Sequence, residues 1–126
     1  VEPPDFELVK GFCEFLPWPD GAFDTVVSGT SLDHVLSLEK ALSEIDRVLA
    51  PGGKFVLWIA SVPGAKEYKP KEGNLDAIDE FHMFHFNEEW LEPMLKRLFS
   101  LQDRLSFKTP SFDHIFYSFE KAGAPR

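Results

Sequence analysis

The stretch FDTVVSGTSLDHVLSLEKALSEIDRVLAPGGKFVLWIA, residues 23–60, decides the fold of this chain. It opens with FDTVVS (23–28), a short β-branched run that is typical of a strand. From Leu38 to Leu49 the apolar residues recur every three or four positions, which predicts a helix. PGG (51–53) predicts the end of that helix, and KFVLWIA (54–60) is apolar on both faces, as a strand of a covered parallel sheet is. Strand, helix and strand in this order predict one βαβ unit with a right-handed crossover.

The segments on either side of this unit are less regular. ELVKGFCEF predicts a short strand around Glu7 to Gly11. LPWPDGAFD (16–24) has the turn chemistry of two prolines and an Asp-Gly pair. Residues 61–80 show no apolar period, which predicts a long loop of the kind that forms lids or binding loops.

The C-terminal third predicts one helix and two strands. Asn87 can cap a helix, in which Pro93 predicts either a kink or a later start near Glu92. SLQDRLSF (100–107) alternates apolar and polar residues, as an edge strand does. HIFYSF (114–119) is almost entirely apolar and predicts a more central strand.

Length, charge and cysteine content exclude several functions. With 126 residues and a net charge of −8, the chain is the size of one domain and lacks the basic character that nucleic acid or an anionic membrane would attract. No apolar run approaches the roughly 18–20 residues of a membrane-spanning helix. Cys13 is the only cysteine, so no internal disulfide can form. We therefore expect a cytoplasmic protein without nucleic-acid or membrane partners.

Two blocks of the sequence resemble a known family. CEFLPWPDGAFDTVV (13–27) matches a pattern of the type "LPF-d-sFD-vv", and RVLAPGG (47–53) matches "RVLKPGG". Both blocks, at this separation, are similar to the second half of the class I S-adenosylmethionine (SAM)-dependent methyltransferases. The resemblance implies an α/β fold: a partial Rossmann-like methyltransferase sheet, with strands equivalent to strands 3, 4, 5, 6 and 7 of the family, two main helices and an antiparallel last strand.

The same resemblance shows what this chain lacks. The family's GxGxG turn, which lets the backbone approach the amino-acid end of SAM, has no counterpart in the 126 residues. We therefore expect residues 1–126 to be one truncated methyltransferase-like domain, cut near Val1, that binds SAM weakly or not at all. In the family the fourth strand pairs with the first, so FDTVVS (23–28) is expected to form an apolar sheet edge. Either ELVKGF (7–12) pairs with that edge, or two chains form a homodimer across it.

Ligands of open α/β sheets bind beyond the carboxyl ends of the strands. By the resemblance, Phe12, Cys13 and Glu14 are cofactor-binding residues on the adenine side of SAM. Phe12 stands where we align an acidic residue of the family, so it offers stacking on the adenine in place of hydrogen bonds. Packing of Phe12 in the core is the alternative.

A second group follows the strand FDTVVS. Gly29, Thr30 and Ser31 are expected to let the cofactor lie against the backbone, with an ordinary strand-to-helix turn as the alternative. Next to them, Asp33 and His34 lie where the family can face the methyl acceptor. His34 is a candidate catalytic base, and a solvated histidine near a helix start is the alternative.

A histidine pair lies in the aromatic stretch DEFHMFHF. His82 is a second catalytic candidate, and His82 and His85 could line the acceptor pocket or pack among the aromatic rings. With Asp79 they form only a weak metal-site pattern, because neither HExxH nor a cysteine cluster is present, and no metal is expected.

Together these features predict methyl transfer from SAM to an unidentified small-molecule acceptor, with low activity in this chain alone. The alternative is a non-catalytic methyltransferase-like module, whose exposed strand edge docks a partner or a second copy.

Overall fold

The strands form one mixed sheet with both helices on the same side. The computed structural model describes residues 5–67 and 85–123. The elements of these residues are β1 (Phe23–Gly29), the short 3-10 helix η1 (Leu32–His34), α1 (Leu38–Val48), β2 (Leu49–Ser61), α2 (Glu88–Leu98), β3 (Phe99–Lys108) and β4 (Asp113–Lys121). The sheet order is β1-β2-β4-β3, with β1 parallel to β2 and the other neighbours antiparallel. The predicted α/β fold with a mixed sheet is therefore confirmed.

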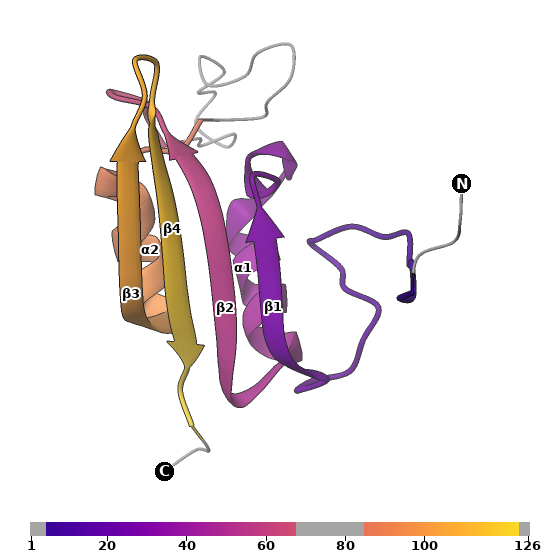
Figure 1. Ribbon diagram of the computed structural model, residues 1–126. Helices are drawn as coiled ribbons and strands as arrows, with labels where there is room; N and C mark the ends of the chain where they lie inside the picture. Colours follow the sequence, from indigo (N-terminus) through magenta and orange to yellow (C-terminus); the bar gives the residue numbers. More distant parts are fainter. Residues whose placement is uncertain (1–4, 68–84, 124–126) are drawn as a thin grey trace.

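Figure 1 shows α1 and α2 behind the sheet, α1 behind β1 and β2 and α2 behind β3 and β4. We call this side the covered face and the side turned toward the viewer the open face. How these four strands correspond to the numbered strands of the family stays a prediction.

The βαβ unit β1–α1–β2 forms as its sequence predicts. The Ser37 side chain caps α1 by accepting a hydrogen bond from the Lys40 amide at 3.3 Å. One face of the helix is buried against the sheet through Ala41, Leu42 and Ile45. The helical spacing of these apolar residues thus becomes a packing surface, because residues three and four apart share a helix face.

The Pro-Gly-Gly turn after α1 brings the start of β2 close to β1. Gly52 has a φ of 77°, a left-handed conformation that glycine adopts without steric cost. A Cβ on Gly53 would lie 2.8 Å from the Ala50 carbonyl oxygen and 3.0 Å from that of Asp24. Only glycine therefore allows this close approach of the β2 backbone to β1.

The second helix starts where Asn87 predicts. The Asn87 side chain accepts a hydrogen bond from the Glu89 amide at 2.9 Å and donates one to the Val62 carbonyl at 3.0 Å. α2 then continues past Pro93 to Leu98 as one helix. A start near Glu92 is therefore wrong, because the Asn87 cap already satisfies the first turn.

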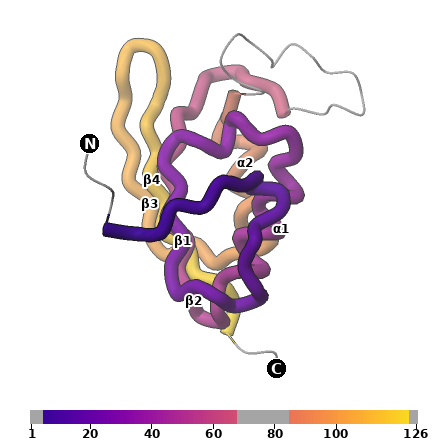
Figure 2. The backbone as a smooth tube through the Cα atoms, turned by 90° about the vertical axis from the view of Figure 1, so that its right-hand side faces the viewer, coloured from indigo at the N-terminus to yellow at the C-terminus, as the bar shows by residue number. Residues whose placement is uncertain are grey.

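The segment before β1 differs from its prediction. Residues 7–11 form no strand and are exposed, so the strand expected around Glu7 to Gly11 is wrong. Figures 1 and 2 show this arm running beside the β1 edge as an irregular loop. Among the described residues no strand lies outside β1, so the pairing of ELVKGF with β1 is also wrong. Closer to β1, residues 16–21 contain two prolines and an Asp-Gly pair, and Glu44 and Arg47 hold them against α1.

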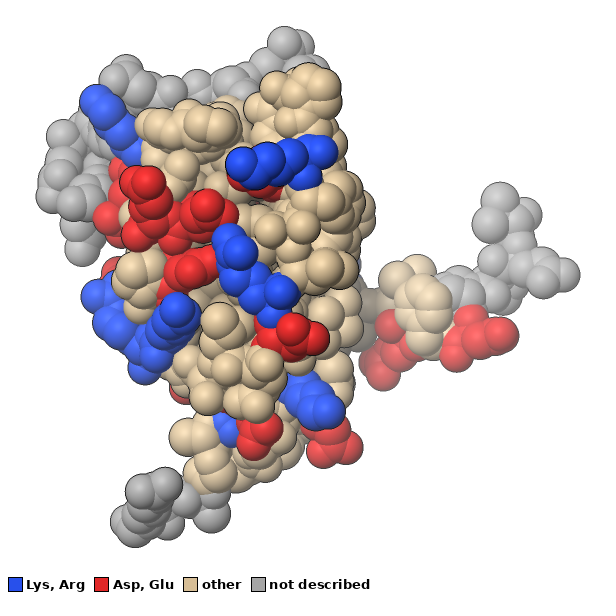
Figure 3. Space-filling view, turned by 60° about the vertical axis from the view of Figure 1, so that its left-hand side comes forward, with Lys and Arg blue, Asp and Glu red and all other residues tan. Residues whose placement is uncertain are grey.

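The other edge strand, β3, is tied to α2 by charged side chains. Arg104 donates to Glu92 and to Glu88, each at 2.8 Å, and Tyr117 on β4 donates to Glu92 at 2.7 Å. Figure 3 shows acidic and basic side chains side by side on this part of the surface. Burial raises the pKa of the Tyr117 hydroxyl, and its hydrogen bond to Glu92 adds to the rise, so the group stays protonated and donates.

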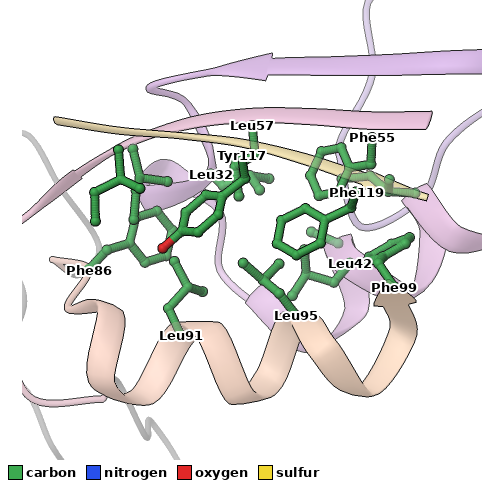
Figure 4. Packing of buried hydrophobic residues seen from close by; sticks show 14 of the residues in the cluster. Leu32, Leu42, Phe55, Leu57, Phe86, Leu91, Leu95, Phe99, Tyr117 and Phe119 are labelled. Carbon is green, nitrogen blue, oxygen red and sulfur yellow. The ribbon is translucent and has the colours of Figure 1, made fainter. Parts of the chain in front are cut away.

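The core lies between the covered face and the two helices. Figure 4 shows side chains from the strands pointing at Leu91 and Leu95 of α2. Phe55, Phe99 and Phe119 pack with ring centroids 5.2–6.2 Å apart. Among the helices of the described residues, none combines the length and the apolar character that crossing a bilayer requires.

Candidate functional site

The carboxyl end of β1 carries an exposed turn of three small residues. Gly29, Thr30 and Ser31 lead from β1 into η1, and all three are exposed. The Thr30 amide donates to the Trp58 carbonyl at 2.9 Å, which extends the β1–β2 pairing by one residue. The Ser31 hydroxyl lies 3.0 Å from the hydroxyl of Ser28. Backbone atoms at this end of the sheet are therefore accessible to a ligand.

Thr30 is held in a strained conformation. Its φ of 49° lies in the left-handed region, where a β-branched residue is a genuine outlier. Residues in such conformations persist only where the surrounding structure imposes them, and they concentrate at functional sites. No pattern in the sequence indicates this strain, and the neighbouring Gly29 does not have a positive φ in this structure.

His34 lies at the end of η1 beside an acidic neighbour. Its Nε2 is 3.4 Å from Asp33 Oδ1, and its side chain is half exposed. An acidic group at this distance can orient the imidazole ring. The pair thus has the chemistry of a base with an orienting carboxylate, on the turn that follows the strained residue.

The other predicted cofactor segment lies at the start of α1. Phe12 and Phe15 form an isolated bridge, and Lys40 Nζ lies 5.5 Å from the Phe15 ring centroid. Lys40 is in the first turn of α1, which follows the carboxyl end of β1 through η1. Both predicted cofactor segments therefore lie near the amino-terminal end of α1.

The three residues of that segment have different surroundings. Phe12 is 73% exposed, so core packing of this ring is wrong. Glu14 is buried, and Cys13 is exposed. Partial burial of the thiol raises the pKa of Cys13, and the Glu14 carboxylate adds to the rise. Cys13 is therefore largely protonated at neutral pH and a poor nucleophile.

Arg47 fixes the loop that carries this segment. It donates to the carbonyls of Trp18 at 2.7 Å and Leu16 at 2.9 Å, and to Asp20 at 3.0 Å. Its Nε donates to Glu44 at 2.6 Å, and Glu44 in turn accepts from the Leu16 amide at 3.0 Å. The hydrogen bond from Arg47 is the main reason that the pKa of Glu44 is lowered. In the sequence Arg47 appears only as the first residue of RVLAPGG, and its loop contacts are not visible there because the partners lie 27 to 31 positions away.

The predicted histidines are only partly placed. His82 and Asp79 lie outside the described residues. His85 is half-buried and precedes Phe86, whose carbonyl accepts a hydrogen bond from the Val62 amide at 2.7 Å. His85 is thus next to the carboxyl end of β2, beside the strand whose end carries the Gly29–Ser31 turn.

A surface hollow lies elsewhere, between α2 and β3. It is lined by Glu88, Glu89, Glu92, Pro93, Lys96 and Arg104. Because Arg104 already binds Glu88 and Glu92, these carboxylates serve to hold β3 on α2. None of the predicted site residues lines this hollow.

Comparison with known proteins supports the resemblance. The family model described as "Methyltransferase domain" matches residues 1–57. The chain is 50% identical over 48 residues to the demethylmenaquinone methyltransferase of Symbiobacterium thermophilum, covering 38% of this chain and 19% of the relative. It is 44% identical over 50 residues to the ubiquinone/menaquinone biosynthesis C-methyltransferase UbiE of Methylobacterium nodulans, covering 40% of this chain and 20% of the relative. The match thus spans about a fifth of the length of these curated relatives.

Solved structures share the fold at low sequence identity. A putative methyltransferase from Bacillus halodurans has a TM-score of 0.73 at 19% identity, over 92% of this chain and 78% of that one. The 1,6-didemethyltoxoflavin-N1-methyltransferase of Burkholderia thailandensis, solved with 1,6-didemethyltoxoflavin and S-adenosylhomocysteine, has a TM-score of 0.67 at 19% identity, over 87% and 48%. The predicted resemblance to class I SAM-dependent methyltransferases is therefore confirmed, and SAM is the cofactor that this family implies.

Proposed function

We propose that this chain, whose sequence and fold are those of a class I SAM-dependent methyltransferase, supplies the adenine side of the cofactor site and part of the acceptor site for methyl transfer to a small molecule. The observation that carries this proposal is the turn after β1. There an exposed small-residue backbone, a strained Thr30 and the His34–Asp33 pair follow one another within six residues, from Gly29 to His34. Accessible backbone suits a bound cofactor, and a half-exposed imidazole suits proton removal from an acceptor.

The residues present fit one part of the cofactor. Phe12 offers an exposed ring on which an adenine can stack, and the backbone of Gly29 to Ser31 is open to contact. No GxG sequence is available for the amino-acid end of the molecule. When bound, SAM would supply an electrophilic methyl group on its sulfonium: the methyl–sulfur bond breaks as an acceptor atom bonds to the methyl carbon in line, and S-adenosylhomocysteine is the leaving group.

The roles of the protein residues follow from this chemistry. Phe12 and the turn after β1 orient the donor, because positioning of donor and acceptor accounts for much of the rate of such a displacement. His34 takes a proton from an oxygen or nitrogen acceptor, and Asp33 orients its ring. His82 stays a second candidate for the same step. Arg47 holds the loop before β1 so that Phe12 keeps its position.

A chain that holds only the adenine side of the cofactor, which we call a half-site, should show a specific pattern of ligand affinities. Calorimetry on the 126-residue chain should give weak SAM binding and no tight stoichiometric complex. 5′-Methylthioadenosine, which lacks the amino-acid end, should bind within about threefold of SAM, because the missing part finds few partners in this chain. Tight one-to-one SAM binding, or loss of all binding with methylthioadenosine, would contradict the half-site.

The stacking role of Phe12 has a matched control in the same arm. Phe12→Ala should weaken methylthioadenosine binding about tenfold, as loss of one base-stacking ring does. Phe6→Ala removes a ring that is 68% exposed, against 73% for Phe12, and should leave binding unchanged. Equal effects of the two substitutions on methylthioadenosine binding would contradict a role of Phe12 in the site.

A second candidate function is a non-catalytic interaction module, in which two chains pair across the β1 edge as a homodimer. The exposed Val27 on that edge, 70% accessible, favours it. Such a module would be a dimer in solution and would bind neither SAM nor methylthioadenosine. A cytoplasmic location is proposed for either function, on the single cysteine alone.

A further inference from the structure

Trp58 on β2 is connected to the candidate site through both its backbone and its ring. The Trp58 carbonyl accepts the hydrogen bond from the Thr30 amide at 2.9 Å. In the register of β1 and β2 Trp58 lies beside Gly29, and a Cβ placed on Gly29 would be 3.7 Å from Cε3 of the indole. The indole thus lies beside the first residue of the turn after β1, and the Trp58 backbone holds the second.

A hydrogen bond to His114 on β4 fixes the indole in this position. The indole Nε1 donates to His114 Nδ1 at 3.1 Å. The indole also stacks on Phe116, with ring centroids 5.1 Å apart. Stacking restricts the plane of a ring, whereas a hydrogen bond also fixes the direction of its N–H edge. His114 therefore decides how the indole is turned beside Gly29.

His114 is itself held between aromatic rings. Its ring centroid lies 4.9 Å from that of Phe107 on β3 in a stacked arrangement, and 4.9 Å from that of Phe112, which it meets edge-on. Trp58, His114, Phe107 and Phe116 form an aromatic patch on the open face, in which Trp58 and Phe107 are exposed and the other two are half-buried. Figure 1 shows the carboxyl ends of β1 and β2 and the β3–β4 hairpin turn at the same end of the sheet. The imidazole is thus positioned by its neighbours and still accessible to protons from water.

The hydrogen bond from Trp58 exists only while His114 is neutral. An acceptor nitrogen carries no proton, so the ring proton of His114 is on Nε2, whereas both nitrogens of an imidazolium are donors. A proton on Nδ1 would point at the indole N–H, and the hydrogen bond would be lost. Histidine is the side chain whose charge changes between about pH 5 and pH 8. Mild acid should therefore release the edge of the indole.

The neighbouring elements present uncharged groups to His114. Trp58 from β2, Phe107 from β3 and Phe112 from the hairpin turn face its ring. The next pair toward the hairpin turn, Lys108 and Asp113, alternates to the covered face. Charged residues of the open face lie toward the other end of these strands: Lys54, Asp103 and Glu120. The described contacts of His114 are thus the Trp58 hydrogen bond and aromatic rings.

We propose that Trp58 is a positioning residue for the turn after β1, and that neutral His114 holds its indole where this turn can receive the cofactor. The inference rests on the proposed function, in which the turn contacts the cofactor. The left-handed conformation of Thr30 persists only because the surrounding structure imposes it, and the hydrogen bond to the Trp58 carbonyl is one such contact. An indole that leaves its position should therefore change the conformation of the turn.

Nuclear magnetic resonance tests this link without a ligand. The three tryptophans give three indole N–H signals, and the Trp58 signal is the one that Trp58→Phe removes. In the parent chain the Trp58 indole signal and the Thr30 amide signal should shift together between pH 7.5 and pH 5.5. The Trp18 indole, which packs edge-on against Phe23 at the amino end of β1, should not shift and serves as the internal control.

Two substitutions separate the charge of His114 from its hydrogen bond. His114→Asn places an oxygen that does not titrate near the position of Nδ1, so at pH 5.5 its Trp58 indole should exchange with water about three- to tenfold more slowly than in the parent. His114→Phe keeps a ring without an acceptor, so at pH 7.5 the indole should exchange faster by a similar factor. His34→Gln is the matched control, because His34 can also change its charge near the turn. It should leave the shift of the Trp58 signal intact, and circular dichroism should show every variant folded.

The functional measurement is the affinity for methylthioadenosine by calorimetry. It should fall about three- to tenfold from pH 7.5 to pH 5.5 in the parent chain, as loss of one hydrogen bond implies, and should not fall with His114→Asn. A fixed Trp58 signal in the parent, an equal shift with His114→Asn, a Thr30 signal that does not follow Trp58, or equal affinities at the two pH values would each overturn the proposal. If methylthioadenosine does not bind at all, the proposed function fails, whereas the ligand-free signals still decide whether Trp58 positions the turn.

Discussion

The two faces of the sheet have similar residues and opposite surroundings. On β4, Phe119 points to the covered face and is fully buried among Phe55, Phe99 and Tyr117. Phe116, three residues earlier, points to the open face and stacks on rings that are themselves partly exposed. The difference shows that apolar composition alone does not say which face of a strand becomes core. The helices decide that by lying on one side.

The largest expected effect separates these two phenylalanines. Phe119→Ala should lower the free energy of unfolding by about 3–5 kcal/mol, because it leaves a cavity in a packed core. Phe116→Ala should cost about 1 kcal/mol or less, because its site is already open to water. Urea unfolding of both variants measures the contrast. Equal losses would mean that the open face is covered in solution.

A smaller effect is expected where β4 is tied to α2. Tyr117→Phe removes the 2.7 Å hydrogen bond to Glu92 and should cost about 1.5 kcal/mol, near the lower end for a bond to a charged acceptor, because Arg104 still binds Glu92. Ser118→Ala, on the next residue and the open face, should change stability by less than about 0.5 kcal/mol. Thermal unfolding followed by circular dichroism compares the two, and a larger loss for Ser118→Ala would reverse the assignment of faces.

The two ends of β1 also differ in backbone strain. Its carboxyl end holds Thr30 in the left-handed region, so Thr30→Gly should stabilise the protein by about 1 kcal/mol. Thr25→Gly, within the same strand, should destabilise it by about 0.5–1 kcal/mol. If Thr30 belongs to the site, the stabilised variant should also bind methylthioadenosine less well. Destabilisation by Thr30→Gly would show that the strain is absent.

Arg47 and Glu44 hold the loop before β1 on α1, and this contact should make the free energy of unfolding depend on pH in the acid range. Arg47 lowers the pKa of Glu44 in the folded protein, so this contribution is present above the unfolded carboxyl pKa, about 4.3, and is lost as the pH falls through the lower folded value. Arg47→Met should therefore destabilise the protein at pH 7, and the difference from the parent chain should narrow below about pH 4. A difference that stays constant from pH 7 to pH 3 would exclude the Glu44 contribution.

The elements of the chain were largely predictable from local patterns. The helix Leu38–Val48 and the strands on either side follow from apolar spacing and from the Pro-Gly-Gly turn. The central position of β4 and the edge position of β3 follow from the difference between a continuous and an alternating apolar run. The strand expected at Glu7–Gly11 fails because that prediction depended on a few apolar residues with no partner strand to pair with.

The positions of the candidate residues in the fold follow from the sequence, and their geometry does not. The rule that ligands bind beyond the carboxyl ends of strands places Gly29–Ser31 and His34 there, and the structure brings Asp33 to 3.4 Å from His34. The strain at Thr30 and the hydrogen bonds of Arg47 depend on contacts between residues distant in the chain or on a dihedral angle. Neither leaves a periodic signal in the sequence.

By itself the sequence determined the βαβ unit, the family resemblance and the missing Gly-rich turn, because all three are local patterns of residue type and spacing. Only the tertiary structure decided that both helices lie on one face, that β1 remains an edge among the described residues and that Trp58 belongs to an exposed patch. The physical reason is that burial is a property of the neighbours of a residue. KFVLWIA is apolar in both directions, and only the placement of α1 and α2 turns one direction into core and leaves the other partly exposed.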